Sequence, residues 1–253
     1  MALMLGKAPA QPGAVTFAFN TFANINQMKP PPSTFGHEAL VRQWGMLGND
    51  VAGDCVFAGA GHEIKLWNAE AGRSVDISDQ TALNNYSKFT GYNPNDPSTD
   101  NGTVVAEWLS YRRKVGFLDD HGKPHKIGAY LALEPGNVAQ LQYAAYYFDG
   151  VGLGLRFPQQ WMDIFSQGGR VWPSLRRPNW IGGHYVPVVA YRDHKPLIFT
   201  WNAKVELTIA AYTQTCDEAY AYLSPEKISN GVDLEGFNYT KLKSMLTQLK
   251  AVR

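Results

Sequence analysis

The pattern of apolar and polar positions changes character about halfway along the chain. In the first part, good helix formers and apolar residues at helical spacing predict helices at 55–71, 79–89 and 103–115. After residue 126, short β-like apolar runs dominate, and a single helical stretch is predicted at 135–146. We expect strands in five segments: 127–131, 150–155, 185–191, 197–201 and 219–223. This order predicts an α+β fold whose two lobes meet at a groove.

The first 36 residues differ from the rest, because they are rich in Pro, Gly and Ala and contain three consecutive prolines at 30–32. Such chain favours extended structure. We therefore expect residues 1–36 to form an extended arm that wraps the domain, with a short strand at 15–19. Residues 37–253 are expected to form a single domain, with lobes at about 37–125 and 126–253.

Composition narrows the classes of function. The 253 residues are 45% hydrophobic and 18% charged, which suits a packed core. The net charge is +1 with no basic stripe, so nucleic acid is not an expected partner. There is no apolar run of membrane-spanning length and no signal-peptide core, so no membrane partner is expected. Two cysteines cannot form a disulfide framework and favour a reducing compartment, and a cytoplasmic or virion-associated location is expected.

Cys55 is the first candidate for chemistry. It follows a turn at 48–54 that is rich in Gly, Asn and Asp, and Asp54 is suited to cap the helix that Cys55 begins. A helix N-terminus lowers a thiol pKa, because unpaired amides and the positive end of the dipole stabilise the thiolate. Cys55 is therefore a candidate nucleophile, and a buried structural cysteine is the alternative interpretation.

One histidine is better placed than the others to serve as a base. His62 lies on the Cys55 helix but about 10.5 Å along its axis, which is too far for contact. His121 and His125 lie in a hydrophilic turn whose spacing predicts no metal site. His37 and His194 also lie in turn-like segments. His184 follows two glycines and begins an apolar strand, which makes it the candidate base; a structural strand histidine is the alternative.

Two asparagines are candidates for supporting roles. A hairpin centred on residue 193 or 194 would pair residues whose numbers sum to 386 or 388. Either register would place Asn202 near His184 and on the same face of the sheet. Asn202 is thus the candidate that orients the imidazole. Asn49, six residues before Cys55, is the candidate oxyanion donor beside the Cys55 amide, with a turn-forming role as the alternative.

These residues and their order resemble the papain-like cysteine peptidases. That family has a Gln six positions before a Gly-x-Cys helix start, which Asn49 and 53–55 resemble. Its Ser-Glu-Gln segment, Asn-Gly loop and His-x-Val strand are similar to residues 77–80, 101–102 and 184–191. His184 also lies 129 residues after Cys55, close to the papain spacing. The resemblance covers about residues 30–225 and implies a papain-like fold, with a helical N-terminal lobe, an antiparallel β-rich C-terminal lobe and the active site between them.

The chain also departs from that family. Trp201-Asn202 reverses the family's order of Asn before Trp, Val56 replaces the Trp after the nucleophile, and the flanking disulfides and room for an inhibitory prodomain are absent. The segments 44–50 and 216–220 are similar to a bacterial and phage-borne group with this core. Membership in this bacterial and phage-borne group would imply the fold of the chain more directly than it would imply an enzymatic activity.

Two classes of function follow. The first is a thiol hydrolase, a cysteine-type peptidase or amidase, that acts on a peptide or protein through an acyl-enzyme on Cys55 and needs no cofactor. The alternative is a catalytically inactive papain-like binding or structural protein, for instance a virion component with a protein assembly partner.

Overall fold

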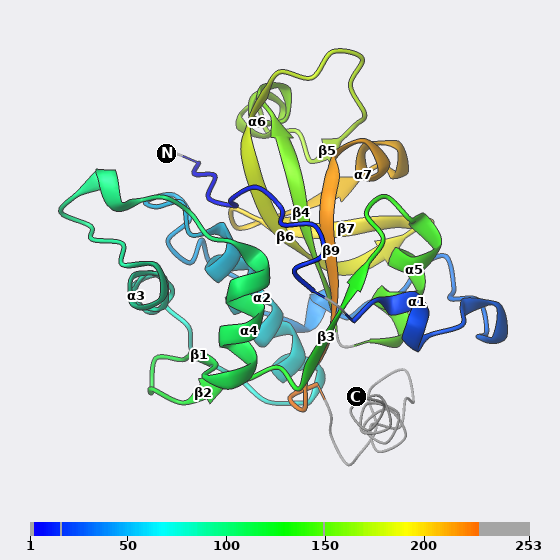
Figure 1. Cartoon of the computed structure of the whole chain (residues 1–253), viewed down its shortest axis with the longest axis horizontal. Coiled ribbons are helices and arrows are strands. Elements are labelled where there is room, and N and C mark those ends of the chain that lie inside the picture. The colour runs from blue at the N-terminus through cyan, green and yellow to red at the C-terminus, as the bar shows by residue number, and fades with distance from the viewer. Residues whose placement is uncertain (1–2, 16, 149, 228–253) are drawn as a thin grey trace.

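A seven-stranded sheet forms the centre of the molecule, and helices lie against both of its faces (Figure 1). The computed structural model describes residues 3–15, 17–148 and 150–227. The strand order is β3-β9-β4-β6-β7-β8-β5, and neighbours are antiparallel except for the parallel pair β5 and β8. The sheet strands are β3 (Ala129–Leu133), β4 (Gly150–Pro158), β5 (Val171–Trp172), β6 (Trp180–Arg192), β7 (Lys195–Thr200), β8 (Ala203–Leu207) and β9 (Cys216–Leu223).

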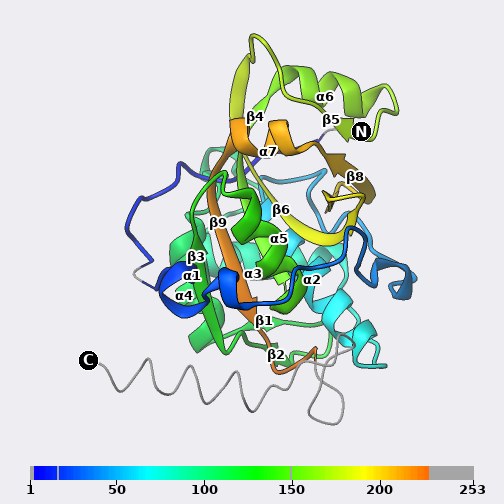
Figure 2. The ribbon, with the colours of Figure 1, turned by 90° about the vertical axis from the view of Figure 1, so that its right-hand side faces the viewer.

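The helices divide into two groups, one on each face of the sheet (Figures 1 and 2). The first group is α2 (Cys55–Glu70), α3 (Asp79–Thr90) and α4 (Val105–Lys114), with the small ribbon of β1 (Phe117–Leu118) and β2 (Pro124–His125) beside it. The second group is α5 (Val138–Tyr147), α6 (Gln159–Ser166) and α7 (Ile209–Thr215). The remaining short elements are α1 (Phe19–Phe22), η1 (Ile25–Gln27), η2 (Glu38–Leu40) and η3 (Pro97–Thr99).

Alternation along the strands builds one core on each face. Ala219, Ala221 and Leu223 of β9 join the core under α5–α7, while Tyr220 and Tyr222 join the core under α2–α4. Successive residues of a strand point to opposite faces, so a single strand serves both layers. The sheet is therefore the common wall between the layer of α2–α4 and the layer of α5–α7.

Helix α2 approaches the sheet closely because it carries glycines on its packed side. A Cβ at Gly59 would lie 2.6 Å from Cδ1 of Tyr185 on β6, closer than packed side chains allow. The helix is buried along most of its length. This contact fixes the N-terminus of α2, where Cys55 lies, against the middle of β6.

The α+β order predicted from the sequence is confirmed, and so are all of its predicted helices and its five strands, with bounds that shift by a few residues. The strand predicted at 15–19 is wrong: Ala18 makes an isolated bridge with Ala132, and α1 begins at Phe19. Aromatic packing explains the difference, since Phe19 is fully buried against Phe148 instead of lying in a strand. Within the described residues, no helix combines the length and apolar character needed to cross a membrane.

Candidate active site

Cys55 is the first residue of α2, and its sulfur contacts the strand that carries His184. The backbone N–H of Tyr185 donates to Cys55 Sγ over 3.4 Å. Only 2% of the Cys55 surface is exposed. Asp54 occupies the N-cap position as predicted, but its side chain makes no capping hydrogen bond. The structure thus brings the candidate nucleophile to the residue that follows the candidate base.

The His184 ring is held by a hydroxyl and an indole. Its Nε2 lies 2.7 Å from Oγ1 of Thr200, the last residue of β7, and its ring stacks on Trp201 with centroids 4.4 Å apart. Phe157 of β4 packs edge-on against the same ring. His184 is fully buried, and its Nδ1 has no hydrogen-bond partner among the described residues. One ring nitrogen is therefore fixed, and the other is available for proton transfer.

Asn202 does not make the hydrogen bond to His184 that the hairpin argument predicted. Its Oδ1 accepts from the backbone N–H of Gly45 at 3.2 Å, and Thr200 takes the position beside the imidazole. The β6–β7 turn consists of Asp193 and His194, whose backbones are both in the left-handed conformation. The numbers of paired residues next to this turn therefore sum to 387. A bulge further along changes this sum to 386 at the pair Val188↔Ile198. The ladder then ends before Asn202, which lies in the next turn with φ +57°. Thr200, which sequence reasoning missed, had a signal: it precedes Asn202 by two positions and so shares its face in an extended strand.

Asn49 lies in the turn before α2 and is 2% exposed. Its Nδ2 donates to the backbone oxygen of Ala52 at 3.2 Å, which braces the turn. A side-chain hydrogen bond from Asn49 also acts on the Asp54 carboxyl, where it opposes the rise in pKa that burial causes. The turn-forming role considered from the sequence is therefore present, and the oxyanion role stays a prediction.

Residues 6–8 of the N-terminal arm lie between β6 and the segment that precedes α4, which are the two walls of the predicted groove. On the strand side, Lys7 N donates to Gly183 O at 3.1 Å; on the helical side, Thr103 N donates to Gly6 O at 2.8 Å and Ala8 N donates to Thr103 O at 2.9 Å. A Cβ at Gly183 would lie 2.5 Å from Lys7 O, so this glycine admits the arm. The arm thus spans both walls of the groove directly over the candidate nucleophile.

Burial sets the protonation of the two candidate catalytic groups. Burial raises the pKa of the Cys55 thiol to about 12. The hydrogen bond from the Tyr185 amide lowers this pKa, but its effect is smaller. Burial lowers the pKa of His184 to about 3. With the arm seated, the pair is a neutral thiol and a neutral imidazole.

A buried polar network lies behind the site and joins α2 to the sheet. Tyr185 Oη donates to Glu63 Oε1 at 2.7 Å and lies 2.5 Å from Tyr222 Oη. The second oxygen of Glu63 pairs with Arg112 of α4, which is fully buried and faces the Trp67 ring 5.0 Å away. Because Glu63 is on the helix of Cys55 and Tyr185 follows His184, this network fixes the two catalytic elements relative to each other.

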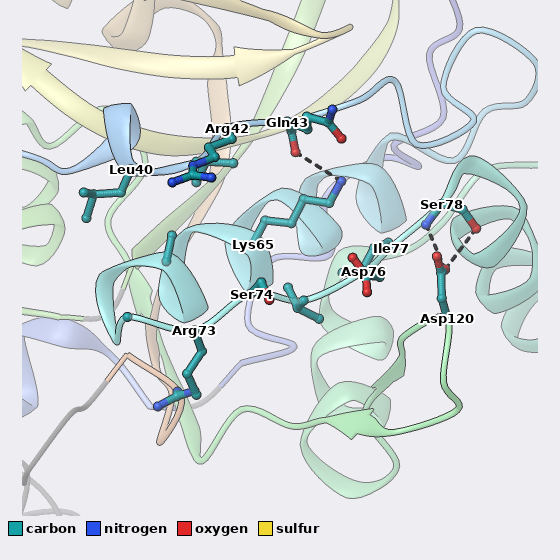
Figure 3. Close-up of a pocket in the computed structure, with 14 residues that line it drawn as sticks. Leu40, Arg42, Gln43, Lys65, Arg73, Ser74, Asp76, Ile77, Ser78 and Asp120 are labelled. Atoms are coloured by element: carbon teal, nitrogen blue, oxygen red, sulfur yellow. Dashed lines mark hydrogen bonds between the residues drawn. The ribbon is translucent and has the colours of Figure 1, made fainter.

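A cavity of about 780 Å³ lies elsewhere, beside the C-terminal half of α2 (Figure 3). Lys65 extends along it and donates to the backbone oxygen of Trp44 at 2.9 Å, while Asp120 accepts from Ser78. Neither Cys55 nor His184 lines it. Among the described residues, there is no cluster of three or more His, Cys, Asp or Glu side chains that could hold a metal ion.

Neither a protein-family model nor a curated protein matches the sequence. Solved structures do match. Xylellain, a cysteine protease from Xylella fastidiosa, aligns with TM-score 0.59 and 15% identity over 87% of this chain and 96% of that one. ProCathepsin B S9 from Trypanosoma congolense aligns with TM-score 0.59 and 12% identity over 87% and 86% of the two chains. The Carica candamarcensis cysteine protease CMS1MS2, in complex with E-64, aligns with TM-score 0.54 and 14% identity over 77% and 99%. At these identities the likeness concerns the fold, and the chain has the α+β fold of papain-like cysteine proteases.

Proposed function

We propose that this protein is a cysteine peptidase-like thiol hydrolase that acts on a peptide or protein substrate through an acyl-enzyme on Cys55. The observation that carries the proposal is the position of the Cys55 sulfur. It lies at the N-terminus of α2 and accepts the amide N–H of Tyr185, directly after His184. A thiol in this position lies at the positive end of a helix and beside the strand that carries the imidazole, and among the described residues no hydrogen bond joins Cys55 Sγ to His184 Nδ1.

His184 Nδ1 takes the proton of Cys55 in the proposed reaction, because Nε2 is bonded to Thr200. The thiolate attacks the substrate carbonyl, the C–S bond forms, and His184 returns the proton to the leaving amine as the C–N bond breaks. Water then loses a proton to His184 and hydrolyses the thioester. The Cys55 N–H and the side-chain amide of Asn49 are the proposed oxyanion donors.

Removal of the arm is part of the proposed mechanism. A thiol pKa of about 12 opposite an imidazole pKa of about 3 makes proton transfer unfavourable by on the order of 10 kcal/mol. Burial causes both shifts, so water that enters when the arm leaves would bring the two pKa values closer. The seated arm therefore corresponds to an inactive resting state.

The experiment is hydrolysis of a peptide library by the Gly6→Ala protein, whose arm is displaced and which serves as the parent chain, and by three further variants of it. Cys55→Ala and His184→Ala are each expected to abolish cleavage. Cys216→Ala, which removes the other thiol, is the matched control and is expected to cleave like the parent chain. Cleavage that survives Cys55→Ala would overturn the proposed mechanism.

The second candidate is a non-enzymatic papain-like binding or structural protein, such as a virion component of the bacterial and phage-borne group. The neutral pair and the filled groove are the observations that favour it. It predicts that the library stays intact even in a variant whose arm is displaced. Cleavage that depends on Cys55 excludes it.

A further inference from the structure

Lys7 of the arm is a buried lysine whose ammonium group lies in an acidic pocket of β9. Its Nζ lies 3.1 Å from Asp217 Oδ2 and 3.1 Å from Glu218 Oε1, and it donates to the backbone oxygen of Ala8 at 3.0 Å. Lys7 is only 5% exposed. Lysine is seldom buried unless its charge is paired, and here two carboxylates face one ammonium.

The pocket has room for a long side chain because β4 has a glycine at this point. A Cβ on Gly154 would overlap both Cε of Lys7 and Cγ of Glu218. Any larger residue at position 154 would therefore close the pocket. Tyr220 donates its hydroxyl hydrogen to Glu218 Oε2 at 2.8 Å, which holds the carboxylate in place.

The acidic pocket lies near Cys55, because the charge of Lys7 acts on the Cys55 thiol. The backbone of Lys7 donates to Gly183 O, and Gly183 is the residue before His184. The preceding residue, Gly6, accepts from Thr103 on the opposite wall. An extended chain that uses these backbone bonds passes Cys55 and directs one side chain toward Glu218.

Charge decides which side chain suits the pocket. Glu218 is 6% exposed, and its Oε1 has no hydrogen-bond partner among the described residues beyond the ion pair with Lys7. An uncharged side chain in place of Lys7 would leave a buried carboxylate without its cation, which is strongly unfavourable. Arginine and lysine both supply that cation.

From this geometry we infer that the acidic pocket of Asp217 and Glu218 selects peptides with a lysine or arginine side chain, and that Lys7 occupies it in the resting protein. The inference rests on the proposed function, since it assigns the substrate class of the same groove. The competing explanation is that the ion pair only anchors the arm and takes no part in recognition.

The experiment measures binding rather than turnover. In full-length Lys7→Ala protein, the rate of iodoacetamide labelling at Cys55 is followed by mass spectrometry in the presence of capped peptide amides. Two peptides are compared, identical except for lysine in one and norleucine in the other. Norleucine has nearly the length of lysine without its charge. Gly6→Ala, whose Cβ would overlap the Gly53 carbonyl, is a second way to unseat the arm without altering the pocket.

The lysine peptide is expected to protect Cys55 at a concentration at least about tenfold lower than the norleucine peptide. Adding Glu218→Gln is expected to reduce that difference to within about twofold. Adding Glu206→Gln instead, which removes a carboxylate paired with Lys195 on another part of the sheet, is expected to preserve it. Equal protection by both peptides, or protection by neither, overturns the inference.

These outcomes are independent of the test of the proposed function. Protection reports occupancy of the groove, so a charge preference can be present in a chain that cleaves nothing. Conversely, cleavage that depends on Cys55 but shows no preference for the lysine peptide would support the hydrolase and overturn the acidic pocket as its specificity site.

Discussion

Nε2 of His184 lies 2.7 Å from Oγ1 of Thr200, so a threonine hydroxyl is the group that orients the candidate base. The hydrogen bond is buried, since Thr200 is 4% exposed and Trp201 stacks on the imidazole. In the proposed mechanism, a fixed Nε2 leaves Nδ1 as the nitrogen that would exchange a proton with Cys55. Thr200 is thus a positioning residue that acts through His184.

Thr200→Val is expected to lower kcat about tenfold with little change in KM, because it removes the orienting hydrogen bond but keeps the side-chain shape. Asn202→Gly is the matched control, since glycine tolerates the left-handed backbone at this position and removes only the bond to Gly45. Steady-state kinetics on one peptide substrate compare the two variants. A loss of kcat in Asn202→Gly but not in Thr200→Val would reverse the assignment.

The sequence predicted Cys55 and His184 because each depends on local signals. A turn that leads into a helix and two glycines before an apolar strand are visible within a few residues. Asn202 makes no bond to His184 because β7 ends at Thr200 and Asn202 lies in the following turn, although past the bulge near Val189 the paired residue numbers sum to 386, as one of the two predicted registers required. The local positions of Cys55 and His184 could thus be predicted, the end of the strand ladder could not, and the catalytic roles of both residues stay predictions.

The arm and its pocket could not be predicted from the sequence. Lys7 and Glu218 meet only after every strand of the sheet has been placed, and a lone lysine near the N-terminus carries no signal of burial. The Pro- and Gly-rich composition predicted extended chain for residues 1–36, where the structure has the short helices α1 and η1, and it did not predict the path of the arm. The same holds for Arg112, which the structure buries completely.

The ion pair of Glu63 and Arg112 is expected to be strongly coupled. Glu63→Gln leaves a buried guanidinium without its carboxylate and is expected to reduce the free energy of unfolding by about 3–5 kcal/mol. Glu63→Gln with Arg112→Met is expected to cost much less than the sum of the single changes. Urea denaturation of the four proteins measures the coupling.

The pair of Lys195 and Glu206 is the control for that experiment. Its side chains are 37% and 28% exposed, so the same double-mutant cycle is expected to give under about 1 kcal/mol. Equal coupling energies at the two pairs would contradict the role assigned to burial.

Stability is expected to fall as the pH falls below neutrality, partly because of His62. Burial lowers the pKa of His62 to about 3, from an ordinary value near 6.5 in the unfolded chain. Between these values the unfolded state binds the proton and the folded state does not, so stability is present above about pH 6.5 and is lost as the pH decreases toward 3. From pH 6.5 to 5 the expected loss is about 2 kcal/mol for this histidine.

Urea denaturation of the parent chain and His62→Gln at pH 7 and pH 5 checks this dependence. The variant is expected to lose about 2 kcal/mol less between the two pH values. His121→Gln is the control, because the side chain of His121 is 74% exposed. A pH dependence that is unchanged in His62→Gln would show that His62 is not the group responsible.

Displacement of the arm is expected to expose Cys55 and to lower the pKa of its thiol. A Cβ on Gly6 would overlap the Gly53 carbonyl oxygen, and backbone on both sides prevents an easy adjustment, so Gly6→Ala unseats the arm. In the parent chain, iodoacetamide labelling of Cys55 should still be rising at pH 10, since the thiol pKa is about 12. In Gly6→Ala, water reaches the sulfur, and the apparent pKa should decrease by at least one unit toward the ordinary value of about 8.5.

Two controls accompany this test. Gln11→Ala changes an exposed residue of the same arm, and its Cys55 is expected to label as in the parent chain. Burial also raises the pKa of Cys216 to about 12, and Cys216 in Gly6→Ala is expected to label as in the parent chain. An identical Cys55 profile in Gly6→Ala would show that the arm does not control access to the nucleophile.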